Sequence, residues 1–214
     1  MKRLTVLLTA AMLSISSLDA CSQSEDRKMS IQEQTEQRFR PNPNPKEAYR
    51  IRIKINDAPG PLKLMSDISV GYMAENCSYL ITSKIIGATA HPRKSLKTPI
   101  YKVGEDEYET VIYRDAMLDE DYFGEGICRW KPDGFGAGFK ATGLPEETEF
   151  NFGDFVYNLV EKKIITKYYW KARYPFPINP QTDFVDFGSE SLDAFSAENQ
   201  KNLFTITLTI EDIK

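Results

Sequence analysis

Histidine and cysteine are scarce in this sequence of 214 residues, which holds one histidine and three cysteines. A metal site needs more ligands than His91, Cys77 and Cys128 provide, and the chain has no CxxC motif. The GxSxG motif of serine hydrolases is absent as well, and His91 would be the only histidine available as a general base. We therefore expect no metal, no cofactor and no enzymatic activity.

Positive charge is not in excess either. Lysine and arginine number 27 against 31 aspartates and glutamates, a formal net charge of −4. Nucleic-acid-binding domains usually carry a basic excess, so we expect no nucleic-acid partner. Beyond the N-terminus, no apolar stretch approaches the length of about 20 residues that a membrane-spanning helix needs. The remaining composition, 41% hydrophobic and 27% charged, is typical of a globular protein.

The N-terminus has the pattern of an export signal. Lys2 and Arg3 precede an uncharged, mainly apolar run at residues 4–15, which has signal-peptide length. The run leads to Leu18-Asp19-Ala20-Cys21, which resembles the lipobox of bacterial lipoproteins. The resemblance implies that residues 1–20 are removed and that Cys21 is acylated, which would anchor the chain to the membrane.

Two further expectations concern this anchor. Ser22 stands where an aspartate would mark retention in the inner membrane, so the resemblance implies the outer membrane, with the protein facing the periplasm. The alternative is an ordinary secretory signal cleaved near Ala20, which would leave Cys21 as a free thiol.

The region that follows predicts a flexible tether at residues 21–46, ahead of a single β domain at residues 47–214. The tether is polar, has few large apolar residues and contains a proline-rich run at 41–45. Ser30 and Glu33 are spaced as a capping box for a short helix at 31–38.

With Cys21 acylated, Cys77 and Cys128 remain as an even pair. The periplasm is oxidising, so we predict a disulfide between them, closing a loop of about 50 residues. Two buried free thiols are the alternative. We expect this bridge to be structural.

Period-two alternation predicts strands. It is clearest at residues 49–55, where Tyr and Ile alternate with Arg and Lys, and at 204–210, where Phe, Ile and Leu alternate with Thr. A short helix fits 191–202, with Ser191 as its cap. Two hairpins are expected, turning at 131–134 and at 161–163. The pattern indicates an all-β fold, a mostly antiparallel β-sandwich or open barrel with at most one or two short helices. Further strand candidates are residues 64–72, 78–85, 108–113, 126–130, 135–141, 150–160 and 164–172.

The glycine-rich run at residues 134–139 resembles a phosphate loop only in composition. No lysine followed by serine or threonine comes after it, so we interpret it as a strand whose Phe135, Ala137 and Phe139 face the core.

Acidic and aromatic side chains share one predicted loop: Asp119, Glu120, Asp121, Tyr122 and Phe123. The spacing does not meet the pattern of a calcium loop, which leaves a solvated acidic loop or a partner-binding loop. Aromatic anchors within an acidic rim suit a basic protein surface, so we predict that these five residues contact a protein partner.

A second aromatic run, at residues 167–177, is also basic and predicts secondary contacts at Tyr169 and Tyr174. The alternative is a strand with Tyr168 and Trp170 inward and Tyr169 outward.

The run Gly126-Ile127-Cys128-Arg129-Trp130 resembles the Gly-x-Cys-x-Trp element of small periplasmic lipoproteins. Some of these are encoded beside type VI secretion effectors and act as immunity proteins. The resemblance implies an inhibitor that binds and occludes a secreted toxin, such as a phospholipase or a cell-wall hydrolase. Two alternatives stay open: a structural or assembly lipoprotein of the cell envelope, and an enzyme or small-ligand binder with a deep pocket.

Overall fold

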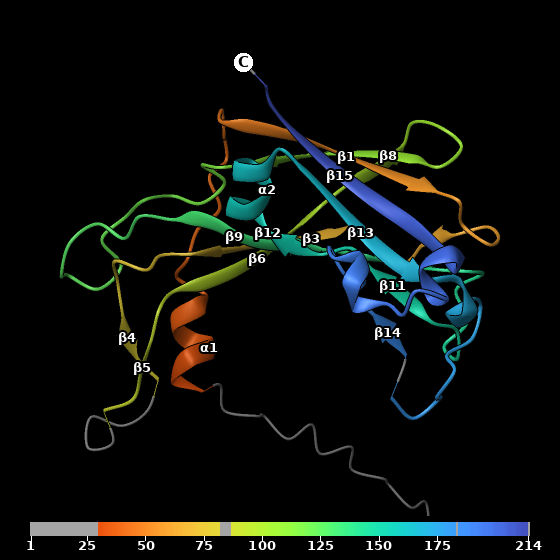
Figure 1. The fold of residues 1–214 in the computed structure, drawn as a ribbon. Helices are drawn as coiled ribbons and strands as arrows, with labels where there is room; N and C mark the ends of the chain where they lie inside the picture. The colour runs from red at the N-terminus through yellow and green to blue at the C-terminus, as the bar shows by residue number, and fades with distance from the viewer. Residues whose placement is uncertain (1–29, 82–86, 183, 214) are drawn as a thin grey trace, which may run out of the picture.

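A computed structural model describes residues 30–81, 87–182 and 184–213 (Figure 1). The predicted signal peptide and the lipobox with Cys21 lie outside these residues. The described part is mostly β, with fifteen strands and two short α-helices, which confirms the predicted all-β sandwich class. The helices are α1 (Ile31–Glu36) and α2 (Val156–Lys162), and the 3-10 turns are η1 (Lys171–Arg173), η2 (Leu192–Ala194) and η3 (Asn199–Asn202).

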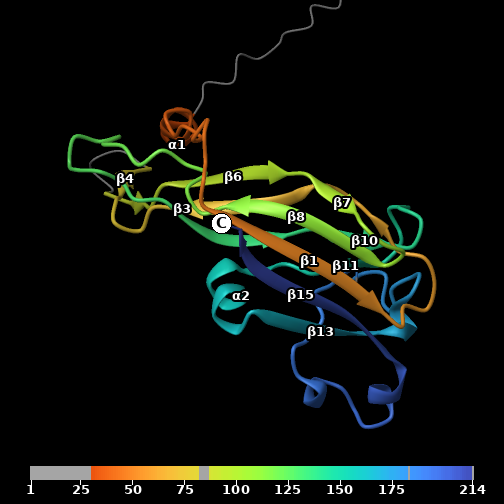
Figure 2. The ribbon, with the colours of Figure 1, turned by 90° about the horizontal axis from the view of Figure 1, so that it is seen from above.

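The first layer is an antiparallel sheet of five strands in the order β13-β15-β1-β8-β7 (Figure 2). Its centre joins the two most regular strands of the sequence, since β1 pairs along its whole length with β15, and Ile53 lies opposite Leu208. Both side chains are fully buried, because alternation places every second residue on the core face. The bounds are β13 Ile164–Trp170, β15 Leu203–Ile213, β1 Ala48–Asn56, β8 Glu107–Tyr113 and β7 Ile100–Lys102.

The second layer contains two four-stranded sheets, β12-β9-β3-β6 and β14-β11-β10-β2. Three stretches of chain run through both sheets, at residues 63–73, 131–140 and 149–155. A ribbon of β4 and β5 extends from this layer. The bounds are β2 Lys63–Leu64, β3 Ile68–Met73, β4 Tyr79–Leu80, β5 Thr89–Ala90, β6 Arg93–Thr98, β9 Lys131–Gly136, β10 Gly138–Lys140, β11 Glu149–Asn151, β12 Asp154–Phe155 and β14 Val185–Asp186.

Aromatic rings join the two layers. Phe150 of β11 lies 5.0 Å from Phe204 of β15, and Phe139 of β10 lies 5.1 Å from Tyr108 of β8, measured between ring centroids. Phe135, Ala137 and Phe139 are buried, which confirms the strand interpretation of the glycine-rich run. The glycines between them allow close approach, because a Cβ at Gly138 would lie 2.4 Å from the Glu149 carboxylate.

The predicted hairpin at residues 126–141 is wrong. Lys131 to Gly134 lie inside strand β9 rather than in a turn, and residues 126–130 form no strand beyond one bridge between Cys128 and Glu120. Pro132 lies where β9 has one partner strand, because β3 pairs with it at Tyr72 while β12 pairs only with Gly134 and Phe135, and proline is tolerated at such strand edges.

The predicted hairpin at residues 150–172 is also wrong. Residues 156–162 form helix α2, and β13 pairs with β15 instead. Val156 and Leu159 are the buried residues of α2, a spacing of three that suits one face of a helix. The helix ends at Lys163, whose φ of 65° turns the chain into β13.

The other predicted elements agree with the structure in part. Helix α1 begins at Ser30 with the predicted capping box, in which Glu33 also bonds back to the Ser30 N–H. Ser191 caps η2, so a 3-10 turn stands where a longer helix was expected. Of the predicted strand at 78–85, Tyr79 and Leu80 form β4, whereas residues 82–86 lie outside the described part.

The segment predicted as a tether packs against the domain well before residue 46. Phe39 is buried, the Asn42 N–H donates to the carbonyl of Ala116 at 2.7 Å, and the Lys46 N–H donates to the Asp115 carboxylate. A single large apolar residue in a polar segment supplies the reason, since burying Phe39 among other aromatic rings stabilises the packed arrangement.

Candidate functional site

The chain between β8 and β9, residues 114–130, forms a long excursion that we call the disulfide loop (Figure 1). Cys128 near its end is bonded to Cys77 in the turn after β3, with 5.5 Å between the Cα atoms. The predicted disulfide is thereby confirmed. Because it links residues 51 apart, it stabilises the fold by roughly 4 kcal/mol on the chain-entropy account.

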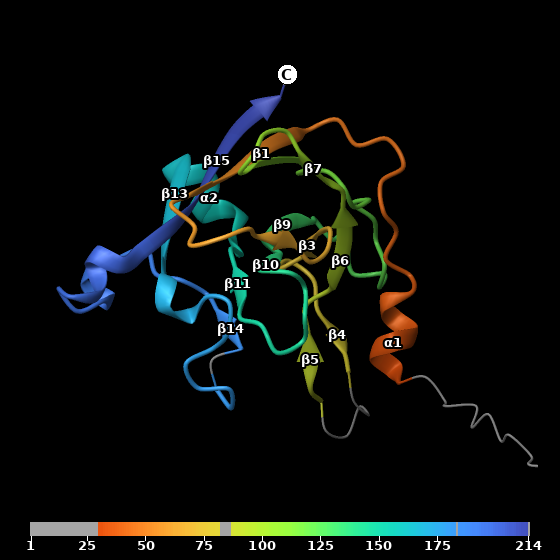
Figure 3. The ribbon, with the colours of Figure 1, turned by 90° about the vertical axis from the view of Figure 1, so that its right-hand side faces the viewer.

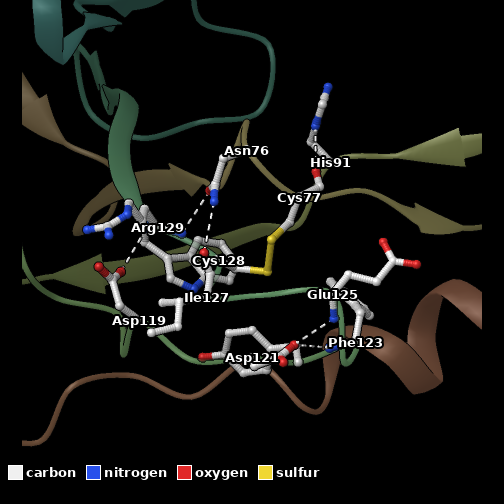
Figure 4. The surroundings of a disulfide bond; sticks show 12 residues. Asn76, Cys77, His91, Asp119, Asp121, Phe123, Glu125, Ile127, Cys128 and Arg129 are labelled. Carbon is white, nitrogen blue, oxygen red and sulfur yellow. Dashed lines mark hydrogen bonds between the residues drawn. A yellow bond between two sulfur atoms is a disulfide. The ribbon is translucent and has the colours of Figure 1, made fainter.

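Asp121 organises the outer part of the disulfide loop. Its Oδ1 accepts hydrogen bonds from the N–H groups of Phe123, Gly124 and Glu125 at 3.3, 2.6 and 3.1 Å (Figure 4). Desolvation opposes ionisation of this carboxylate, but the backbone donors outweigh it and hold the pKa of Asp121 below its usual value. Asp121 therefore shapes the loop from within.

The two neighbouring acidic residues are also engaged inside the protein. Asp119 Oδ1 accepts from the Trp130 N–H at 2.9 Å, which ties the loop to the start of β9. The Glu120 carboxylate accepts from Arg40 Nε at 3.0 Å, and its carbonyl accepts from the Cys128 N–H. All three acidic residues predicted to contact a partner thus hold the loop in shape.

The two aromatic residues of the loop, Tyr122 and Phe123, are partly buried and pack inward against the core. They join a cluster with Phe39, Tyr79 and Trp130, in which the Phe123 ring stacks on Tyr79 at 5.6 Å between centroids. The Tyr122 hydroxyl donates to the Leu118 carbonyl at 2.7 Å. Rings of this size gain more from burial beneath the loop than from exposure to water.

Glu125, Ile127 and Arg129 are exposed side chains in the outer part of the loop, beside these structural residues. Ile127 is 54% exposed, while its carbonyl accepts from Asn76 Nδ2 at 2.8 Å, and Asn76 Oδ1 accepts from the Arg129 N–H (Figure 4). The backbone at the tip is therefore fixed on both sides of Cys128. Ile127 could have been noticed in the sequence, because it is the one aliphatic residue between Phe123 and Cys128 and stands among glycines and an acidic residue.

The secondary aromatic prediction fails at Tyr169. Its side chain is fully buried, and its hydroxyl donates to the Asn151 carbonyl at 2.8 Å. Burial raises the pKa of Tyr169 well above its usual value. The alternative orientation, with Tyr168 and Trp170 inward, is reversed as well, because both are only partly buried. Tyr169 therefore belongs to the core and not to the surface that the prediction required.

Tyr174 lies partly buried at the end of η1. Its hydroxyl donates to the Pro61 carbonyl at 3.0 Å, and its ring covers Gly60, where a Cβ would lie 2.4 Å from the Tyr174 oxygen. This contact fixes the start of the chain that runs from η1 to β14.

That following chain, residues 174–182 and 184–187, runs through the region of β14 (Figure 3) and exposes several large apolar side chains. We call it the apolar segment. It was not recognised from the sequence, because its prolines interrupt any period-two or helical pattern. Its exposed members are Phe176, Ile178, Phe184, Val185 and Phe187.

A cleft of about 450 Å³ lies beside α2, at the base of the disulfide loop. Its charged residues are mostly engaged with the protein itself: Arg114 forms an ion pair with Glu47, and Asp115 accepts backbone N–H groups. Its lining residues are Glu47, Tyr49, Arg114, Asp115, Met117, Asp119, Trp130, Lys131, Pro132, Val156, Tyr157 and Val160.

Within the described ranges, no group of three or more His, Cys, Asp and Glu side chains is placed to hold a metal ion. No helix in the described part of the chain is both long and apolar enough to cross a membrane.

Comparison with known proteins gave no match to a protein family, to a curated protein or to a solved structure.

Proposed function

We propose that this chain is an exported lipoprotein that binds and neutralises a toxic secreted effector. In this proposal Cys21 carries the lipid, the β domain faces the periplasm, and the anchor lies in the outer membrane. The effector is a protein that acts in the cell envelope, such as a phospholipase or a cell-wall hydrolase, and binding occludes its active site.

One observation supports the proposal: the backbone of the disulfide loop is fixed by contacts within the protein, while side chains near its tip, residues 124–127, are exposed. Asp121 bonds three successive N–H groups, and Cys128 is joined to Cys77. Glu125 and Ile127 lie exposed in between. Ordering a flexible loop on binding costs free energy, so a loop that is already ordered binds its partner more tightly. This is the physical requirement for a loop that plugs an enzyme's active site.

The experiment is a growth competition between two strains of the organism that makes this chain. A strain lacking the gene should die beside a parental strain that secretes effectors, and should survive beside a secretion-deficient one. Restoring the gene should restore survival. A deletion strain that grows poorly on its own, with no competitor present, would instead favour the structural or assembly lipoprotein.

Variants then test the loop itself. We expect Glu125→Lys with Ile127→Ser to abolish protection, because both side chains are exposed and the backbone contacts of the loop are kept. The matched control is Tyr101→Ser, which removes a 65% exposed side chain on β7. Protection that survives the loop substitutions would show that this loop is not part of the interface with the effector.

A separate substitution tests the lipid anchor. Cys21→Ser should release the protein from the membrane fraction.

A further inference from the structure

We propose that the cleft beside α2 is a carbohydrate site, which takes an uncharged glycan built of N-acetylhexosamine units. This goes beyond the proposed function, because the effector contact proposed above lies at the tip of the disulfide loop, whereas the cleft lies at its base. Helix α2 and the start of β9, which lie side by side, form much of its wall (Figures 1 and 2). Its volume of about 450 Å³ falls within the range of roughly 300–1,000 Å³ that small-ligand clefts occupy.

The first argument is an aromatic wall that is open to solvent. Tyr157 of α2 lines the cleft and is 60% exposed. Its ring stacks on the exposed ring of Phe155, with 5.3 Å between the centroids, which holds the Tyr157 ring in place before a ligand binds. The face of an aromatic ring is electron-rich, and the C–H groups on the face of a sugar ring pack well against it. An exposed ring held in this way therefore suits a saccharide.

The second argument is the apolar floor of the cleft. Met117, Trp130 and Val156 line it and are buried, so they contribute its inner surface. A methyl group that packs on this floor is removed from water, which favours binding. The acetamido group of an N-acetylhexosamine carries such a methyl, and an unsubstituted hexose does not. The floor therefore favours the N-acetylated sugar.

The third argument is charge, which does not favour a charged ligand. Of the five charged residues in the lining, Glu47 and Arg114 pair with each other, and Asp115 accepts backbone N–H groups. Asp119 and Lys131 remain, and neither forms an ion pair within the described part of the chain. Their opposite signs mean that an anion or a cation would be repelled by one of them. A hydroxyl group both donates to a carboxylate and accepts from an ammonium, so it matches the two together.

The experiment uses the full-length protein and three sugar trimers. Triacetylchitotriose is uncharged, its deacetylated form is positively charged, and trigalacturonate is negatively charged. Isothermal titration calorimetry should show saturable binding of triacetylchitotriose that changes little with salt, and weaker or no binding of the two charged trimers. Failure of triacetylchitotriose to bind would overturn the proposal, as would equal or tighter binding of a charged trimer.

Substitutions locate the binding. Tyr157→Ser should weaken binding of triacetylchitotriose about threefold to tenfold, because the aromatic wall is lost. Tyr157→Phe keeps the ring and should keep most of the affinity. The control is Tyr101→Ser, which removes a similarly exposed tyrosine from β7, outside the cleft, and should leave affinity unchanged.

Thermal unfolding checks that each variant folds. Equal affinity in the Tyr157→Ser and Tyr101→Ser variants would show that the sugar binds elsewhere and would overturn the proposal. The growth competition tests the loop tip separately, so the failure of one proposal leaves the other standing.

Discussion

Glu147 shows how a single residue can stabilise a turn in this fold. Its carboxylate is 2% exposed and accepts hydrogen bonds from the Thr142 N–H and hydroxyl and from the N–H groups of Gly143 and Leu144. Desolvation would raise its pKa, but these donors outweigh the desolvation and lower the pKa of Glu147 to about 2. The ionised side chain therefore closes the turn between β10 and β11.

We expect Glu147→Gln to lower the free energy of unfolding by about 1–3 kcal/mol near neutral pH, because the charge-assisted hydrogen bonds are weakened. The wild-type contribution also depends on pH. An unfolded carboxyl titrates near 4.5 and the folded one at about 2, so the stabilisation is complete above pH 4.5 and is lost as the pH falls through 2. Urea denaturation at a series of pH values measures both effects.

The matched control is Glu146→Gln, at the exposed neighbouring carboxyl. It should unfold like the wild type at neutral pH. If the Glu147→Gln variant lost stability on acidification as steeply as the wild type, this residue would not be the source of the effect.

Residue patterns alone could not orient the strand that contains Tyr169. Both of its faces carry aromatic rings. Lys167, a residue type that usually faces solvent, donates to the Gly153 carbonyl and lies 3.5 Å from Asp154 with a largely buried side chain. A period-two pattern fixes the face of a strand only where one face is polar. The same limit applies to Tyr122 and Phe123, since their neighbours in sequence do not show what lies beneath the loop.

At the scale of elements, the sequence predicted what regular alternation specifies. Strands β1 and β15 were found because isoleucines, leucines and aromatic residues occupy every second position. Strand β8 was found because it is rich in aromatic and β-branched residues, and α1 because its capping box is local. Helix α2 was missed because one buried face over seven residues also resembles a short strand. The disulfide followed from counting cysteines, whereas the apolar segment has no periodic pattern.

The end of α2 offers a test at this scale. Lys163 adopts a left-handed φ of 65°, which costs a side-chain-bearing residue about 1 kcal/mol and glycine almost nothing. Its ion pair with Asp212, at 3.8 Å and exposed, contributes little. Lys163→Gly should therefore raise the free energy of unfolding by about 0.5–1 kcal/mol in urea denaturation.

Lys162→Gly serves as the control, because Lys162 is the last residue of the helix itself. There glycine should lower the free energy of unfolding by about 1 kcal/mol. Two substitutions with effects of the same sign would contradict this account of the helix end.

For the whole molecule, distant parts of the chain must meet before the core forms. Ile51 pairs with Ile210 and Thr110 across adjacent strands, and β13 reaches β1 only through β15. Folds dominated by such long-range pairing fold slowly, because loop closure precedes the gain in contacts.

We expect the oxidised protein to refold on a timescale on the order of milliseconds to seconds after dilution from urea. Stopped-flow fluorescence of Trp130, buried beneath the disulfide loop, and of Trp170 follows the process. Refolding within microseconds would show that local contacts, rather than the pairing of β1 with β15, limit the rate.

The place of β15 between β1 and β13 also has a consequence for biosynthesis. A ribosome delivers Ile51 early and Ile210 late, so β1 leaves the ribosome long before its longest partner strand exists. Until then the nascent chain holds an apolar strand with an unpaired edge, which is an aggregation hazard. A premature stop codon before Thr205 would leave that edge permanently unpaired, and we expect the cell's proteases to degrade such a product.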